Sequence, residues 1–392
     1  MSMSLVVAVV MLGVADAMVG SYFVLYVTEV AGFGPWETGV FVSVHGIGGI
    51  LTSWLAGRAF DRSPSRRYAA AAMFSGATAL ALMTVITSFP LLILLAFTLL
   101  GALVAAFPQL FALARVLLGD GPAGRRSAPL LRSAWSLAWA VGPLLGATTL
   151  ATAGFRAIPR AAAVLIALAA VWILVAVPTP ENRPPAPAPD AGEPPVTLPA
   201  ATLTLLTGGM TLFFAAMFAG SVVLPLYVTS ELHHPTATVG ILFSVCAVVE
   251  VLAALALMVI PPEVSQRLII LAGMAFFVLF FAVTILARGI PLLIAGQAAR
   301  GVGIALVGAA GIRWFQDALA PATGRATTLF ANATTAGMVV SGIIAGGALS
   351  LLGYTGTLLL CAALTLAAAA AFAAGSTNPT PKIKINPMRG YD

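Results

Sequence analysis

The chain consists of long apolar segments separated by short polar breaks. A helix needs about 20 mostly apolar residues to cross the hydrocarbon core of a bilayer. Counting such segments predicts twelve transmembrane helices, with expected spans at 4–29, 36–57, 68–88, 90–118, 127–154, 158–177, 199–230, 237–260, 267–287, 290–316, 325–350 and 354–375. The pattern therefore predicts an all-α membrane protein that crosses the bilayer many times.

The longest polar interruption lies between the sixth and seventh predicted helices. Residues 178–198 are rich in proline and include three of the chain's acidic side chains, a composition that favours extended backbone and cannot pack a core. We expect a six-helix bundle at 1–177, a linker at 178–198, a second six-helix bundle at 199–376 and a tail at 377–392.

The two predicted bundles share a sequence pattern. Five residues recur after a constant offset of 201 positions: Tyr26, Thr28, Gly39, Ser43 and Val44 in the first half, and Tyr227, Thr229, Gly240, Ser244 and Val245 in the second. Such agreement also arises by chance in apolar sequence of low complexity. A true parallel repeat, with a cavity between two pseudo-symmetric halves, is typical of secondary transporters.

The basic residues are distributed unevenly over the predicted loops. Twelve of the nineteen Lys and Arg fall in the tail and in the loops on one side, whereas Arg156, Arg160 and Arg288 fall in the loops on the other. Loops rich in basic residues remain in the cytoplasm. We therefore expect both termini and the linker to be cytoplasmic.

Composition excludes several classes of protein. Hydrophobic residues make up 60% of the chain and charged residues 8%, whereas about a quarter of the residues of a soluble domain are charged. The net charge of +6 is scattered over short loops, so no nucleic-acid surface is expected. Cys246 and Cys361 lie in apolar segments without a partner at ligand spacing, which indicates neither a disulfide nor a metal site.

A short charged loop carries the first family resemblance. Residues 57–67, GRAFDRSPSRR, hold five charged side chains between two apolar segments. They resemble the loop signature of the major facilitator superfamily, in which a Gly is followed by an Asp and by basic residues. Pro64 stands where that pattern has Gly, so the loop keeps the charges of the pattern but not its glycine.

A more specific resemblance extends over both halves. It is carried by residues 108–115 (PQLFALAR), 136–139 (SLAW) with 142–143 (GP), 314–317 (WFQD) and 326–332 (ATTLFAN). These stretches resemble the bacterial sugar efflux transporters of the SET type. The resemblance implies export of sugars or glycosides across the bacterial cytoplasmic membrane in exchange for protons, with a cavity lined by the first, fourth, seventh and tenth helices.

Three ionisable side chains are expected deep in the bilayer, where charge is costly and marks function. Asp16, Glu250 and Arg300 fall near the middle of their predicted helices. An apolar cavity favours the neutral form of a carboxyl group and a nearby arginine favours the charged form. Asp16 or Glu250 is thus expected to bind the coupling proton, the alternative being an ion pair with Arg300 that only holds helices together.

Sugar recognition needs amides, hydroxyls or charges around the ring edges and an aromatic face against its C–H surface. The predicted helices offer these groups at Tyr22, Tyr26, His45, Gln109, Trp135, Trp139, Tyr227, Glu250, Arg300 and Asn332. Aromatic side chains in membrane helices also serve as packing or lipid-facing residues, and a histidine also joins helices. Amides seldom face lipid, which favours Gln109 and Asn332 as ligands.

A second set of charges lies near the predicted cytoplasmic ends of the helices. An alternating-access carrier needs contacts that close one side and can break, and the candidates are Asp61, Arg62, Arg115, Arg132, Asp317 and Arg325. We expect Arg115 to pair with Asp317. Asp61 is expected to meet Arg325 and the positive N-terminal end of the eleventh helix, near Thr323.

Other functional classes are weighed against this interpretation. The chain has no nucleotide-binding loop, nucleophile elbow or zinc-spaced cluster, so neither an enzyme nor a cofactor is expected. A multidrug and proton antiporter is the nearest alternative among carriers. A non-transporting membrane sensor and a lipid-modifying transferase come from other classes. The expected partners are the bilayer, protons and a small sugar, with the protein acting as a monomer.

Overall fold

The computed structural model describes residues 2–119, 122–179, 198–261, 263–319 and 323–376. All regular structure in these residues is helical. Ten helices of the described residues are long and apolar enough to cross a membrane. The predicted linker and tail lie almost wholly outside the described residues, and the predicted domain boundaries stay a prediction.

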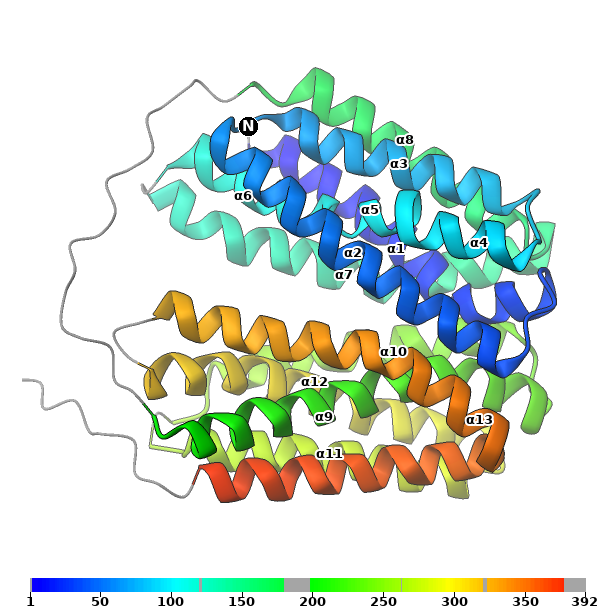
Figure 1. The fold of residues 1–392 in the computed structure, drawn as a ribbon, viewed down its shortest axis with the longest axis vertical. Helices are drawn as coiled ribbons and strands as arrows, with labels where there is room; N and C mark the ends of the chain where they lie inside the picture. The colour runs from blue at the N-terminus through cyan, green and yellow to red at the C-terminus, as the bar shows by residue number, and fades with distance from the viewer. Residues whose placement is uncertain (1, 120–121, 180–197, 262, 320–322, 377–392) are drawn as a thin grey trace, which may run out of the picture.

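The N-terminal helices form one bundle (Figure 1). They are α1 (Ser2–Glu29), α2 (Pro35–Arg62), α3 (Arg66–Met83), α4 (Phe89–Leu95), the π-helical turn η1 (Ala96–Leu100), α5 (Gly101–Leu103), α6 (Ala106–Leu118), α7 (Pro122–Ala153) and α8 (Ala157–Ala176). The fourth expected span, 90–118, is thus a series of short elements from α4 to α6. The helix α3 has 18 residues and is not among the ten candidate spans.

The C-terminal helices form the second bundle, below the first in Figure 1. They are α9 (Ala200–Leu226) with the π-helical turn η2 (Tyr227–Glu231), α10 (Ala237–Leu257), α11 (Gln266–Leu286), α12 (Ile290–Ala318) and α13 (Thr323–Gly375). The last two expected spans both fall within α13. Gly353 interrupts α13 with a φ of 67°, a left-handed conformation that glycine adopts without strain, and the chain reverses direction there.

Equivalent tyrosines have the same contact in both bundles. Tyr26 at the end of α1 donates a hydrogen bond to the carbonyl oxygen of Met83, 2.7 Å away at the end of α3. Tyr227, 201 positions later, donates to the carbonyl oxygen of Ile285 at 3.5 Å, near the end of α11. The repeated tyrosines therefore satisfy helix-terminal carbonyls, which have no partner within their own helix.

Arg66 and Arg267, which are also 201 positions apart, provide a second equivalent contact. Arg66 at the start of α3 donates to the carbonyl oxygen of Val177, directly after α8. Arg267 at the start of α11 donates to the carbonyl oxygen of Ala373 at 3.2 Å and to the hydroxyl of Ser376 at 2.7 Å, at the end of α13. Each arginine places a positive charge at the negative end of a helix.

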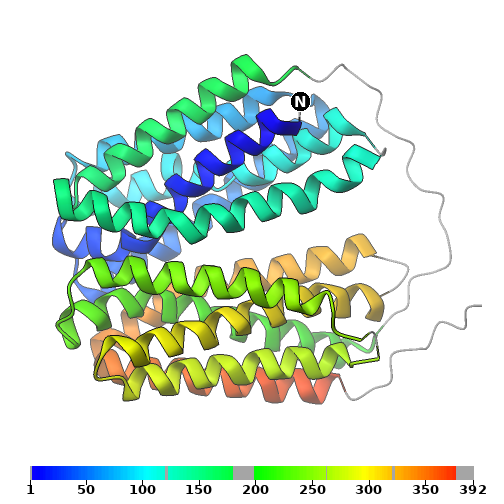
Figure 2. The same ribbon diagram turned by 180° about the vertical axis from the view of Figure 1, so that it is seen from behind.

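The bundles touch at one end and diverge at the other, where α8 finishes and α9 begins (Figures 1 and 2). We call the touching end the closed end. There α2 packs on α13 and α7 packs on α10. A Cβ on Gly39 of α2 would collide with the backbone of Gly342 and Gly346, and one on Gly240 of α10 with the carbonyl oxygen of Pro143. The repeated glycines thus allow both close approaches.

Substitution tests the two arginine caps. Arg66→Ala and Arg267→Ala each leave helix-terminal carbonyls without their charged donor. Each is expected to lower the free energy of unfolding by about 1–3 kcal/mol, measured by thermal or denaturant unfolding in detergent. Arg67→Ala removes an exposed neighbouring arginine and is the control. An equal loss in the control would contradict this assignment.

Candidate functional site

A cavity of about 650 Å³ lies between the two bundles. Its wall includes residues of α1, α2, α6 and α7 from the N-terminal half and of α9, α10, α12 and α13 from the C-terminal half. Most of the wall is apolar. The polar exceptions include Asp16, His45, Ser221, Glu250, Arg300 and Ser341.

Six of the predicted site residues line this cavity. They are Asp16, His45, Trp135 and Trp139 from the N-terminal bundle and Glu250 and Arg300 from the C-terminal bundle. The three ionisable groups predicted to lie deep in the bilayer are therefore brought into one space. Both halves contribute charge to it.

Arg300 is the most enclosed charged group of the cavity, with only 5% of its surface exposed. Its Nη2 donates to the hydroxyl of Ser221 at 2.5 Å, and its Nη1 donates to the Oε1 of Gln297 at 3.2 Å. The guanidinium also lies over the rings of Phe243 and Phe280, with centroids 5.1 and 5.6 Å away. Both hydrogen-bond acceptors are neutral, and Nε has no partner.

Close helix packing places Glu250 beside Arg300. A Cβ on Gly301 of α12 would collide with the carbonyl oxygen of Cys246 and approach the backbone nitrogen of Glu250 to 2.9 Å. Glycine at this position therefore allows α12 to lie directly against α10. The carboxyl group of Glu250 feels the positive charges of Arg132 and Arg300.

Asp16 is held against α7 in the other half. A Cβ on Gly13 would lie 2.8 Å from the Cβ of Ala138, and one on Gly142 would lie 2.5 Å from the Cβ of Ala17, so α1 and α7 pack closely around it. The nearby polar side chain is Trp139. The indole N–H of Trp139 does not complete a hydrogen bond with the carboxyl group, so it remains a free donor.

Aromatic rings form part of the wall in the N-terminal bundle. The ring of Trp135 lies 4.2 Å, centroid to centroid, from that of Phe107, and Phe107 also lines the cavity. His45 of α2 lies 6.0 Å from Phe23, and its Nδ1 is buried without a hydrogen-bond partner. This side offers flat apolar faces, whereas the opposite side offers Arg300 and Glu250.

Five predicted substrate ligands do not line the cavity. Tyr26 and Tyr227 bind helix-end carbonyls. Tyr22 packs against α7 and α10, where a Cβ on Gly146 would meet its ring. Gln109 is buried in α6 with only 3% of its surface exposed, and Asn332 is exposed on α13. In this conformation none of the five would contact a ligand bound in the cavity.

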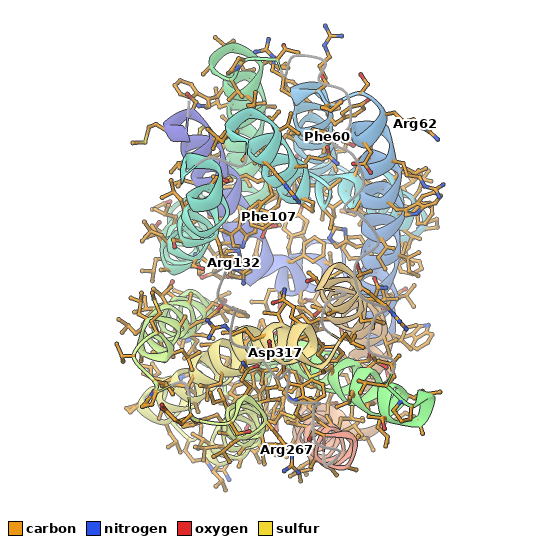
Figure 3. The ribbon with its side chains drawn as sticks, turned by 90° about the vertical axis from the view of Figure 1, so that its left-hand side faces the viewer. Phe60, Arg62, Phe107, Arg132, Arg267 and Asp317 are labelled. Atoms are coloured by element: carbon orange, nitrogen blue, oxygen red, sulfur yellow. The ribbon has the colours of Figure 1, made fainter. Side chains whose placement is uncertain are left out.

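All six predicted gating residues are exposed: Asp61, Arg62, Arg115, Arg132, Asp317 and Arg325. Figure 3 looks along the helices and labels Arg62 and Arg132 in the N-terminal bundle and Asp317 in the C-terminal bundle. Asp317 accepts a hydrogen bond from the Nε2 of Gln266 at 3.1 Å rather than one from Arg115. The side chain of Thr323 lies outside the described residues, so the predicted contact of Asp61 with this helix end remains a prediction.

Ser221 is a site residue that the sequence pattern did not indicate. Its hydroxyl accepts from Arg300 and donates to the carbonyl oxygen of Met217, one turn earlier in α9, at 2.8 Å. Serine in a membrane helix commonly bonds to its own backbone. Ser221 differs from the other hydroxyl residues of α9 only because its hydroxyl lies next to Arg300 of α12 in the folded protein.

The sequence was compared with families and characterised proteins. It matches the family described as "Major Facilitator Superfamily" over residues 5–260 and 209–390. A Deinococcus radiodurans protein named "Putative sugar efflux transporter" is 33% identical, and the alignment covers 94% of this chain and 96% of that protein. "Sugar efflux transporter A" of Escherichia coli K12 is 28% identical, with 86% of each chain covered.

Solved structures show the same fold. The crystal structure of the nucleoside transporter NupG superimposes with a TM-score of 0.82, at 15% sequence identity, and covers 96% of this chain and 99% of that one. A POT family transporter in complex with 5-aminolevulinic acid superimposes with a TM-score of 0.77, at 13% identity, and covers 98% and 96%.

These comparisons agree with the loop at 57–67 and with the arrangement of two helical bundles around a central cavity. They confirm the predicted family and the prediction that the protein is a transporter rather than an enzyme. The chain is a multi-pass membrane protein that belongs to the major facilitator superfamily, and within it to the sugar efflux transporter type.

Proposed function

We propose that the protein exports sugars or glycosides across the bacterial cytoplasmic membrane by proton antiport with alternating access. Twelve transmembrane helices in two six-helix halves, both termini in the cytoplasm and a single chain as the working unit complete the proposal. One observation carries it: charged groups from both halves, Asp16, Glu250 and Arg300, line one cavity between the bundles. Charge in such a position is costly, which is why ionisable groups deep in a membrane protein mark function.

The two sides of the cavity suit a sugar. Trp135 and Trp139 offer ring faces to the C–H surface, while Arg300 and Glu250 offer a donor and an acceptor to the hydroxyls. The names of the relatives, sugar efflux transporters, support the same substrate class. Ser221 and Gln297 then position Arg300, because both accept from its guanidinium.

The unequal ends of the molecule support alternating access. In this conformation α2 meets α13 and α7 meets α10 at the closed end, whereas the gating charges at the other end are exposed. Rocking of the halves would open the closed end and bring Arg115 and Arg132 towards the charges of the C-terminal bundle. Opposite charges there would stabilise the second conformation in a form that can break.

Proton exchange is assigned to the two cavity carboxyl groups. A carboxyl group removed from water favours its neutral form, and one beside arginines favours its charged form. Asp16 lies among apolar groups and Trp139, whereas the carboxyl group of Glu250 interacts electrostatically with the positive charges of Arg132 and Arg300. A proton would enter by binding to one of these carboxyl groups, and the sugar would leave through the same cavity. The carrier would thereby exchange protons for sugar.

The apolar character of most of the wall favours a second candidate, a multidrug and proton antiporter. Such a carrier accepts chemically unrelated apolar compounds. Resistance of cells expressing the protein to a set of unrelated toxins, combined with no sugar flux, would favour this alternative.

Counterflow of a panel of labelled sugars into proteoliposomes, with and without an imposed pH gradient, tests the main proposal. We expect accumulation of at least one sugar or glycoside and faster export when the outer solution is acidic, since protons then enter as sugar leaves. The absence of counterflow for every sugar tested would contradict sugar transport, and a rate that is independent of the gradient would contradict antiport.

Removing the cavity carboxyl groups tests the coupling. Asp16→Asn and Glu250→Gln replace groups that can carry a proton by amides that cannot. We expect at least one substitution to abolish the acceleration of export by an acidic exterior, measured as sugar flux in proteoliposomes. Glu29→Gln, at the exposed end of α1, is the matched control. Full coupling in both cavity variants would exclude these residues as the proton site.

Arg300 is expected to be required for substrate binding. Arg300→Gln keeps a polar group but removes the charge and the fork of donors, so we expect sugar counterflow to fall about tenfold or more, equivalent to roughly 1.4 kcal/mol of lost binding. Arg313→Gln changes an exposed arginine of the same helix and serves as control. If the two variants transported equally, Arg300 would have no role as a ligand.

A further inference from the structure

An unusual contact joins the bundles at the closed end. Ser43 of α2 donates a hydrogen bond to the carbonyl oxygen of Val339 at 2.7 Å and accepts one from the backbone N–H of Ile343 at 3.0 Å. Val339 and Ile343 are four residues apart in α13 and would pair with each other in a regular α-helix. A side chain of one bundle thus binds both members of a backbone pair of the other.

Glycine makes this contact possible. A Cβ on Gly342 would lie 2.5 Å from the hydroxyl oxygen of Ser43 and 2.5 Å from the carbonyl oxygen of Gly39. Any larger residue at position 342 would push α2 away from α13. Gly347, five residues later on the same helix, has only Trp36 nearby, at 3.9 Å from such a Cβ.

The segment of α13 held by Ser43 forms part of the cavity wall. Met338 and Ser341 both line the cavity, on either side of Val339 in the sequence. The hydroxyl of Ser341 donates to the carbonyl oxygen of Met338 at 2.6 Å. Movement of this segment would therefore change the wall of the cavity as well as the contact between the bundles.

The equivalent contact in the other half lacks these hydrogen bonds. Ser244 of α10 occupies the position 201 residues after Ser43, one turn beyond Gly240, which packs on α7. Its side chain is buried, and its hydroxyl has no hydrogen-bond partner. Of the two closing contacts, α2 with α13 is thus hydrogen bonded through its serine, and α7 with α10 is not.

We propose that Ser43 is a positioning residue of transport that holds the closed end of the cavity shut through α13. This rests on the alternating access of the proposed function. On opening, the carbonyl of Val339 and the N–H of Ile343 would keep each other as partners within the helix, and the hydroxyl of Ser43 would bond to a carbonyl of its own helix, as serines in helices do. Each polar group of this contact then has a partner in both conformations, which keeps the gate reversible in a membrane.

Cysteine accessibility tests the proposal in the full-length carrier. Ile304→Cys places a thiol on the part-exposed cavity wall, in a background carrying Cys246→Ala and Cys361→Ala. Its reaction with a membrane-impermeant maleimide is measured from each side in oriented vesicles. We expect Ser43→Ala to raise the rate from the closed-end side about five- to tenfold, as loss of net hydrogen bonding would, and to lower the rate from the other side.

The repeat supplies the matched control. Ser244→Ala removes the equivalent hydroxyl, which has no partner, and is expected to leave both labelling rates unchanged. Equal effects of Ser43→Ala and Ser244→Ala would overturn the proposal. A purely structural role for Ser43 would lower the thermal stability without changing the ratio of the two rates, and that result would overturn it as well.

A second pair of variants tests the proposal even if Ser43→Ala folds poorly. Gly342→Ala is expected to open the closed end further than Ser43→Ala does, whereas Gly347→Ala should not change access, because its Cβ meets only Trp36 at 3.9 Å. Equal access in these two glycine variants would also overturn the proposal. The proposed transport function is tested by a separate measurement. If it is wrong, the unsubstituted protein shows no sugar counterflow.

Discussion

Hydrocarbon offers no hydrogen-bond partners, and the rest of this structure depends on that constraint. Backbone groups are paired within helices, and hydroxyl side chains such as Thr28, Thr207 and Ser221 bond to carbonyls of their own helix. Carbonyls at helix ends need other donors, which Tyr26, Arg66 and their equivalents 201 residues later provide. In both halves of the internal repeat, helix-end carbonyls are thus paired with side-chain donors at equivalent positions.

The same constraint concentrates charge in the cavity. Exposure of Asp16, Glu250 and Arg300 to lipid would cost free energy. Close packing of helices at glycine positions places all three in the cavity between the bundles. Arg300 is stabilised by neutral acceptors and aromatic rings rather than by a direct carboxylate partner. A charged group held in this way can exchange partners without loss of its supporting contacts, as a carrier requires.

The two interfaces between the bundles differ although the repeat relates them. Gly39 and Gly240 both allow helices to touch, but only Ser43, and not Ser244, finds partners across the interface. At this interface the repeat therefore preserves the close packing but not the hydrogen bonds of the serine. Of these two contacts at the closed end, only that of α2 with α13 is hydrogen bonded through its serine.

Hydropathy and loop charge indicated the membrane class and most helix positions from the sequence alone, because they are local properties of the chain. The family resemblance was carried by short motifs such as residues 57–67 and 108–115. The sequence also indicated Asp16, Glu250 and Arg300, since midplane charge is rare. It did not separate Trp139, which lines the cavity, from Tyr227, which binds a helix end. Helices that are apolar on every face show no stripe that marks the side facing a partner. Only the packing of the helices decided that Ser221 meets Arg300 and that Ser43 meets α13, because those contacts join residues 79 and about 300 positions apart.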